Sequence, residues 1–461
     1  MRMQGKDTFL LICIAVLVGL LAVLVFFAVG LPAPSEPTEP TIPSTSFPTT
    51  GITSQPTTEP TTAPTTEPTE PPVVKTATVT LGAVGDVLMH KPVINTGLQS
   101  DGSYNFEDIF QYFADYCSGV DYMVANLETT LAGLDNGYPY QGYPRFNSPD
   151  GIITTLQNVG FDMILTANNH SYDTGHTGLI RTQEVLQNHG LDWLGTKLNE
   201  QDKNYLVVNL EGISVGMVCY TYETDGDSVK KSLNGLPVKE EDRPLINSFD
   251  VAHLSLFYEE MRQNMEAMES EGVDVVIAFM HWGTENKLTP LGSQTMIAQQ
   301  LCEMGVDVII GGHPHVVQPM ELLTSADGNH STICLYSMGN FISNQRREED
   351  GIPKSGHTED GILFTVTMSR YSDGTVLVEA VEAIPFWVNK AKISGAVAYR
   401  ILPLDIPQEQ WKEAFSIDDA TYARLEESLE RTNALIAEGS AKVDAYLAEY
   451  VAQVEAAIGV G

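Results

Sequence analysis

Short apolar runs alternate with helix-like stretches between residues 74 and 405. The apolar runs are of the kind that predicts strands buried on both faces. A unit of glycine, an apolar residue and aspartate follows several of the helix-like stretches, at 119–121, 160–162, 190–192, 272–274 and 305–307. A glycine in that position ends a helix in the left-handed conformation, and a short turn then leads into the next strand. The pattern predicts an α/β fold for this segment.

The pattern changes after Asn340. Apolar and polar residues alternate over 362–388 around Ser372-Asp373-Gly374, which predicts a β-hairpin. Residues 408–458 are rich in Ala, Glu and Leu and predict two helical stretches. We therefore expect a C-terminal helical appendage over 406–461.

The N-terminal segment 8–30 predicts a transmembrane helix. Phe9–Val29 contains no charged residue and is long enough to span a hydrocarbon core of about 30 Å. Arg2 and Lys6 precede it, so residues 1–7 are expected in the cytoplasm and the rest of the chain outside, on a single-pass anchor in the cell membrane. The alternative is a signal peptide cleaved near Ala28-Val29-Gly30.

Residues 31–73 form a linker of repeated Pro, Thr, Ser and Glu with very few apolar side chains. Such a composition cannot bury enough surface to fold, so we expect this segment to be disordered. Its prolines favour extended polyproline II, which at ~3.1 Å per residue reaches on the order of 130 Å.

Charge restricts the choice of partners. The chain has 25 Lys and Arg against 60 Asp and Glu, a formal net charge of −35. This excess of negative charge repels phosphate backbones, so nucleic acid is not an expected partner.

Polar side chains directly follow six of the apolar runs. One run ends in Gly311-Gly312, and His313 and His315 come next, with Pro314 between them. The other runs end at Asp86, Asn126 and Glu128, Asn168 to His170, His281, and Asn340. In open α/β sheets ligands bind beyond the carboxyl ends of the strands, so we expect these side chains to share one site.

These residue types favour a divalent-metal site. Imidazoles, carboxylates and an amide oxygen suit Zn, Mn or Fe, and the absence of cysteine ligands argues against a structural zinc. The candidates are too many for one tetrahedral ion, so we expect two ions bridged by a carboxylate. Such a pair favours hydrolysis of a phosphate ester, with His170 as the acid that protonates the leaving oxygen.

Several segments between residues 78 and 343 resemble one known family. They are GDVLMH, NLE, LTANNHSYDTG, HWGTE, TPLGSQ, GGHPHVVQPME and YSMGNF, in that order. They are similar to the CapA family of capsule (poly-γ-glutamate) synthesis proteins, which is related to the calcineurin-like metallophosphoesterases. The resemblance implies a metallophosphatase-like layered α/β sandwich over 74–405.

The resemblance also implies ligand roles. Glu128 stands where the metallophosphoesterases place a bridging aspartate. The implied ligands are Asn169, His281 and His313 for one ion, and Asp86 and His315 for the other.

One ligand of the family pattern is missing, because Leu88 occupies the position of the histidine in Asp-x-His. His90 is a possible substitute. Glu285 and Asn340 are candidates for orienting the ligands, with simple capping as the alternative. Arg145 is a candidate substrate contact, with a solvated surface arginine as the alternative.

The sequence thus predicts a membrane-anchored, extracellular protein of capsule or cell-surface polymer synthesis, with phosphoester hydrolysis as its reaction. Its expected partners are an anionic polymer or phosphoester substrate and the capsule synthesis machinery. One alternative is a non-catalytic assembly factor that binds the polymer. Another is a metal-dependent amide hydrolase or transferase acting on polyglutamate.

Overall fold

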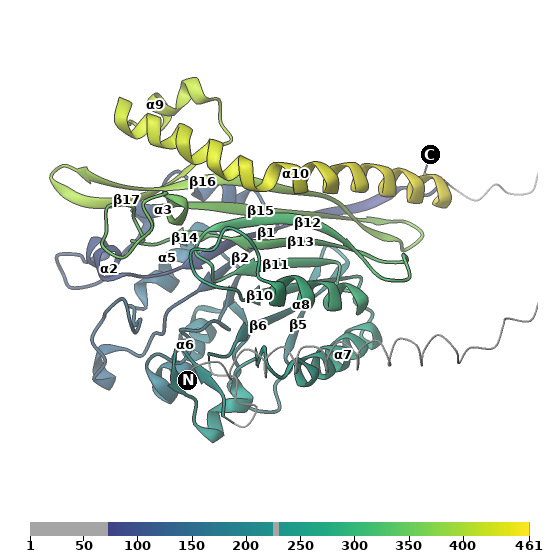
Figure 1. The fold of residues 1–461 in the computed structure, drawn as a ribbon, viewed down its shortest axis with the longest axis horizontal. Coiled ribbons are helices and arrows are strands. Elements are labelled where there is room, and N and C mark those ends of the chain that lie inside the picture. The colour runs from purple at the N-terminus through teal and green to yellow at the C-terminus, as the bar shows by residue number, and fades with distance from the viewer. Residues whose placement is uncertain (1–71, 225–229, 461) are drawn as a thin grey trace, which may run out of the picture. The chain divides into compact units, whose positions relative to one another are not determined.

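Two β-sheets form the centre of the computed structural model, which describes residues 72–224 and 230–460 (Figure 1). The first sheet has the order β17-β16-β15-β1-β2-β3-β4, with β14 paired to β1. Its strands are β1 (Lys75–Val87), β2 (Tyr122–Leu127), β3 (Met163–Leu165), β4 (Asp192–Leu194), β14 (Asn340–Ile342), β15 (Asp360–Tyr371), β16 (Val376–Ile393) and β17 (Ala396–Pro403).

The second sheet has the order β12-β13-β11-β10-β6-β5, with β9 paired to β6. Its strands are β5 (Tyr205–Leu210), β6 (Ile213–Tyr222), β9 (Ser248–Phe249), β10 (Val275–His281), β11 (Val308–Gly312), β12 (Val317–Thr324) and β13 (Ser331–Met338). A separate two-stranded hairpin joins β7 (Ser232–Leu233) to β8 (Leu236–Pro237).

The two sheets pack face to face, and helices cover their outer faces. Along β10, Ile277 and Phe279 lie in the core between the sheets, whereas Ala278 and Met280 pack against helices. The first sheet is covered by α2 (Lys91–Gly97), α3 (Glu107–Phe110), α4 (Ala114–Ser118), α5 (Gly151–Val159) and α6 (Gly175–His189), and the second by α7 (Leu254–Ser270) and α8 (Gly292–Glu303). The predicted α/β fold is confirmed.

The glycines of the repeated Gly-apolar-Asp units end helices as predicted, with one exception. Gly160, Gly190, Gly272 and Gly305 have φ between 70° and 110°, in the left-handed region. The prediction is wrong at Gly119, whose φ of −84° is helical. The short helix α4 therefore ends without a left-handed residue.

The aspartates of four of these units extend the strand ladders. Each aspartate lies just before its own strand, beside a neighbouring parallel strand. Its carboxylate accepts a hydrogen bond from the main-chain N–H of the neighbouring strand's residue that stands one position before the first paired residue. The pairs are Asp121 with Thr80, Asp162 with Met123, Asp274 with Ser214, and Asp307 with Val276, at 2.7 to 2.8 Å. An N–H that would otherwise lack a partner at the start of the ladder is thereby satisfied.

The predicted hairpin around Ser372-Asp373-Gly374 is confirmed, because β15 pairs antiparallel with β16 across that turn. The predicted span 8–30 and the linker up to residue 71 lie outside the described residues. Among the helices of 72–224 and 230–460, none combines the length and hydropathy needed to cross a membrane.

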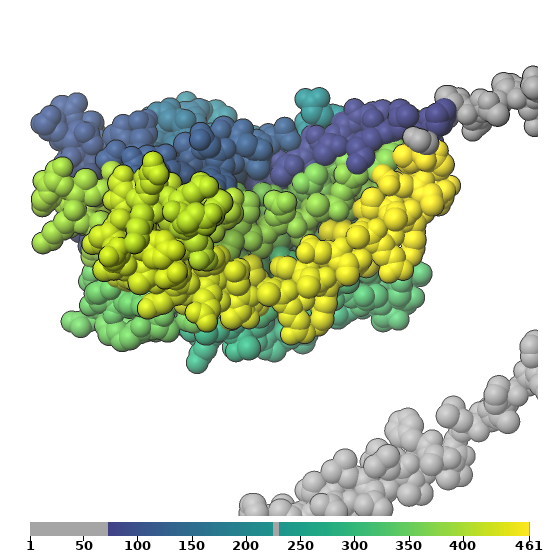
Figure 2. Space-filling model, turned by 90° about the horizontal axis from the view of Figure 1, so that it is seen from above, coloured from purple at the N-terminus to yellow at the C-terminus, as the bar shows by residue number. Residues whose placement is uncertain are grey.

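The C-terminal helix α10 (Asp419–Ile458) closes one edge of the sandwich. It follows the single-turn helix α9 (Trp411–Ala414) and packs on β12 and β16, which belong to different sheets. Ile436, Val443 and Leu447 enter the core between the sheets. Figure 2 shows α10 in yellow crossing this face, with its last turn beside the purple start of β1.

Contact between α10 and β12 depends on Gly439. A Cβ atom at this position would lie 1.9 Å from the main-chain oxygen of Met320. We therefore expect Gly439→Ala to lower the free energy of unfolding by about 1–3 kcal/mol, because the helix must move off the strand. Urea unfolding measures this loss. Gly292→Ala, at a helical glycine with open space around it, is the control, and equal stability of the two variants would contradict the prediction.

Candidate functional site

Six predicted ligands lie together where strands of both sheets end. They are Asp86, Glu128, Asn169, His281, His313 and His315, and none is more than 4% exposed. In the first sheet β1 is parallel to β2, and in the second β10 is parallel to β11. The carboxyl ends of parallel strands share an edge, so the packed sheets bring their terminal side chains together.

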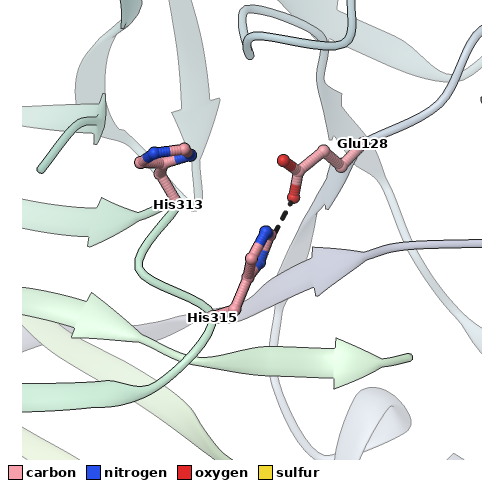
Figure 3. Close-up of side chains that lie close together, drawn as sticks. All are labelled: Glu128, His313 and His315. Atoms are coloured by element: carbon pink, nitrogen blue, oxygen red, sulfur yellow. Dashed lines mark ion pairs between the residues drawn. The ribbon is translucent and has the colours of Figure 1, made fainter. Parts of the chain in front are cut away.

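The Glu128 carboxylate lies among three of the imidazoles, two of which are drawn with it in Figure 3. Its Oε1 is 3.4 Å from Nε2 of His281, and its Oε2 is 3.8 Å from Nδ1 of His315. Within the described part of the chain, neither oxygen makes a hydrogen bond although both are buried. Burial, and then repulsion from the Asp86 carboxylate, raise the pKa of Glu128 well above its ordinary value. A carboxylate buried in this way is stable when it is protonated or when it lies beside a cation, and a bound metal ion would be such a cation.

Two groups of side chains have the proximity needed to hold an ion, and they share Glu128. One consists of Glu128, His313 and His315, and the other of Asp86, Glu128 and His281, with ligand atoms within 4.8 Å of one another in each. The shared carboxylate is the position expected for a bridge. These groups place His281 with Asp86, and His313 with His315. Asp86 also contacts His315, and Asn169 contacts His281, so the expected division of the ligands between two ions stays a prediction.

The His-Pro-His segment has an unusual main chain. His313 has φ of 92° and His315 has φ of 57°, both in the left-handed region. For residues with side chains this costs of order 1–3 kcal/mol each, and such strain clusters at ligand-binding positions. Nδ1 of His313 is buried and has no hydrogen bond to any described residue, so it is available to a ligand.

The two glycines before His313 allow a close approach of neighbouring groups. A Cβ at Gly311 would lie 1.9 Å from the main-chain oxygen of Tyr336 on β13, and one at Gly312 would lie 3.1 Å from Oδ1 of Asp86. Side chains at these two positions would push β11 away from its neighbours.

Asp86 and His315 stabilise each other's charged form. Nδ1 of His315 is 3.0 Å from Oδ2 of Asp86, and Asn126 donates to Oδ1 at 2.7 Å. Burial opposes ionisation of Asp86, but the hydrogen bond and charge of His315 lower its pKa below the ordinary value. Burial likewise opposes protonation of His315, and the hydrogen bond to Asp86 outweighs it, so the pKa of His315 is raised.

The other two imidazoles are held neutral. Burial lowers the pKa of His281 to about 3, and burial with the nearby histidines lowers the pKa of His313 well below its ordinary value. Nε2 of His281 lies 2.7 Å from Oδ1 of Asn169. Neutral imidazole is the form that binds metals.

His170 forms a buried pair with Asp173. Its Nδ1 lies 2.6 Å from Oδ2 of Asp173, and its ring meets Phe146 edge-on at 4.7 Å between centroids. Asn234, from the β7–β8 hairpin, donates to Oδ1 of Asp173 at 3.0 Å. The ring is therefore fixed in orientation, as proton transfer at a defined place requires.

A cleft of about 380 Å³ opens beside the ligands. His90, His170, Glu285 and His315 line it. Nδ1 of His90 faces the main chain, 3.2 Å from the oxygen of Leu88, and His90 belongs to neither ion-holding group. Leu88, in place of the family histidine, gives the cleft an apolar wall.

The remaining candidates differ in position. Asn340 is fully buried, and its Nδ2 donates to the main-chain oxygens of His315 at 3.2 Å and Thr358 at 3.0 Å. It thus fixes the loop that carries His315. Arg145 is exposed and forms no ion pair within the described ranges, and its neighbours Tyr143 and Phe146 line the cleft.

The sequence did not show that three further side chains of the site orient the ligands. Asn126 and Asn168 stand after apolar runs and so belong to the predicted site. Their roles depend on strand register, since Asn126 donates to Asp86 and Asn168 donates to Asn126. Tyr222 ends β6 and its ring lies 4.6 Å from that of His313. The same rule of polar residues at strand ends identifies Tyr222.

Comparison with known proteins places this site in a family. Residues 80–345 match the family described as bacterial capsule synthesis protein PGA_cap. A Bacillus anthracis protein named capsule biosynthesis protein CapA is 25% identical over 293 residues, which are 61% of this chain and 64% of that protein. The match therefore spans less than two thirds of the relative. PGA biosynthesis protein CapA of Bacillus subtilis (strain 168) is 25% identical over 73% of this chain and 81% of its own length.

A crystal structure of a provisionally assigned 5'-nucleotidase from Staphylococcus aureus, in complex with alpha-ketoglutarate, is 15% identical with a TM-score of 0.40. It covers 76% of this chain and 58% of that chain. The family match is the informative one, since it includes every strand end of the site from Asp86 to Asn340. Because it covers more than half of the 461 residues, the chain belongs to the PGA_cap family of bacterial capsule synthesis proteins.

Proposed function

We propose that this protein is a metal-dependent hydrolase of phosphoester type that acts in the synthesis of capsule, poly-γ-glutamate or another cell-surface polymer. The observation that carries the proposal is the Glu128 carboxylate, whose two buried oxygens have no hydrogen bond to any residue that the structure describes and lie among three imidazoles. The resemblance of the motifs to calcineurin-like metallophosphoesterases supports the reaction type.

The side chains at the strand ends fit two divalent ions. Glu128 would bridge them, with Asp86 and His281 on one side and His313 and His315 on the other. Oxygen and imidazole ligands without thiolate favour Mn, Zn or Fe. When bound, such ions supply Lewis-acid activation of a phosphoryl group and of a water nucleophile.

Proton transfer falls to His170. It lines the cleft, and Asp173 holds its Nδ1 side, so the opposite nitrogen, Nε2, is the one available to a substrate. Protonated at Nε2, the ring gives that proton to the leaving oxygen as the ester bond breaks. Asp173 stabilises the imidazolium that carries the proton.

A second candidate is cleavage or transfer of the amide bonds of polyglutamate. Glu285 and Asp350 both line the cleft, and neither forms an ion pair with another described residue. These carboxylates repel an anionic polymer as they repel a phosphate, so bound ions would have to offset them for either substrate. Water activated by such ions attacks an amide carbonyl as well as phosphorus. The name of the Bacillus subtilis relative, a PGA biosynthesis protein, agrees with such a substrate.

The location is also a proposal. The uncharged segment 9–29, with Arg2 and Lys6 before it, supports anchoring in the cell membrane with the folded part outside. Partners in the capsule synthesis machinery would then meet the protein at the outer surface.

Glu128→Gln tests the metal site. Glutamine keeps the size of the side chain and removes the charge, so at least one of two bound equivalents of Mn or Zn should be lost, and hydrolysis with it. Elemental analysis of the purified chain measures the metal.

His313→Ala should lose metal and hydrolysis in the same way, whereas His253→Ala, at an exposed histidine, should lose neither. Intact metal content and hydrolysis in Glu128→Gln would refute the two-ion site, and a wild type that binds metal without turnover would favour a polymer-binding assembly factor.

His170→Asn tests the general acid. Hydrolysis of diphenyl phosphate should fall about 10²–10³-fold, since general acids contribute that much when the leaving oxygen is basic. Bis(para-nitrophenyl) phosphate, whose leaving oxygen needs no proton, should be affected far less. Steady-state kinetics on both esters and metal analysis separate this effect from loss of the ions. An equal decrease on the two esters would show that His170 is not the acid.

A further inference from the structure

One wall of the cleft is a loop that follows β14. We call residues 343–359 the cleft loop. Six of its residues line the cleft, namely Asn344, Gln345, Glu349, Asp350, Gly351 and Ile352. Most of this loop, and all of α10, lie beyond residue 345, where the family match ends.

The helix α10 holds the loop through Arg424. Nη2 of Arg424 donates to Oε2 of Glu359 at 2.7 Å, and Nη1 lies 2.8 Å from Oε1 of Glu348. Glu359 is fully buried at the end of the loop and also accepts a hydrogen bond from Nε1 of Trp387 at 3.1 Å. One guanidinium thus ties two points of the loop to the helix.

Two more side chains of α10 hold the same loop. Nη2 of Arg431 donates to the main-chain oxygen of Gly356 at 3.1 Å and to Oδ1 of Asp360 at 2.5 Å. Glu427 accepts from Nη1 of Arg347 at 2.9 Å. The contacts of α10 are therefore spread along the loop.

The cleft loop also contacts the site from its other side. Asn340 bridges the main-chain oxygens of Thr358 and His315, and Lys390 of β16 lies 2.6 Å from Glu349 and donates to Asn344 at 2.8 Å. The loop is thus fixed against the cleft at its ends, while Asp350 to Ile352 form the wall between them.

We propose that α10 is a positioning element of the substrate cleft, and that Arg424 sets substrate affinity by holding the cleft loop in place. The inference rests on the proposed function, since it takes the cleft as the substrate site. Among the described residues, hydrogen bonds and ion pairs join α10 to the cleft loop, and none joins it to an ion-holding side chain. Loss of Arg424 should therefore weaken substrate binding and leave the ions in place.

Arg424→Ala is the test. Glu359 keeps Arg346 at 3.2 Å and the Trp387 hydrogen bond, so the fold should persist. We expect KM for bis(para-nitrophenyl) phosphate to rise about tenfold with kcat within about twofold, since binding rather than chemistry is affected. Metal content should equal that of wild type, and hydrogen exchange of residues 343–359 should be faster.

Two further variants complete the design. Glu427→Gln, at a half-exposed anchor of the loop, should produce the same change more weakly. Lys442→Ala removes an exposed cation whose ion pair lies within α10 and should change nothing. Unchanged KM and unchanged exchange in Arg424→Ala would overturn the inference, as would a loss of metal in parallel with the rise in KM. A wild type that turns over no ester would overturn the proposed function. The role of α10 could still be judged in that case, because unchanged hydrogen exchange of residues 343–359 in Arg424→Ala would refute it.

Discussion

A carboxylate buried without a hydrogen bond must be protonated or lie beside a positive partner, and the architecture of this site depends on that constraint. Glu128 and Asp86 come from the first sheet, whereas His281, His313 and His315 come from the second. Neither sheet alone contains both halves of the ligand set. The packing of apolar faces that forms the sandwich therefore also assembles the chemistry, and the ligand set exists only when the core is complete.

Sequence reasoning selected candidate residues that the fold brings together, because its signal is local. An apolar run followed at once by a polar residue marks Asp86 or His281 without knowledge of the fold, and the shared edge of parallel strands then brings such residues together. The grouping of His281 with Asp86 and of His313 with His315 does not follow from the sequence. It depends on how the two sheets pack and on the left-handed main chain at His313.

The fold, too, contains features that depend on tertiary structure and could not be predicted from the sequence. Glycine spacing predicted where most helices end, but the hydrogen bonds from the aspartates to neighbouring strands require the strand order. The C-terminal segment 406–461 contains no histidine and no apolar run that ends in a polar cluster, so nothing in its sequence connects it with the cleft. Arg424 and Arg431 of this segment pair with the buried carboxylates of Glu359 and Asp360. The burial of those carboxylates is known only from the tertiary structure. Buried ion pairs add little net stability, yet they specify one arrangement of the groups they join.

The strand β1 separates the two ends of the folded part from the reaction site. Val73, just before β1, forms a bridge with Val460, while Asp86 lies at the far end of the same strand. Thirteen residues of strand correspond to roughly 40 Å at ~3.3 Å per residue. The described chain therefore begins and ends at the end of β1 opposite Asp86, so neither terminus of the described part lies beside the cleft.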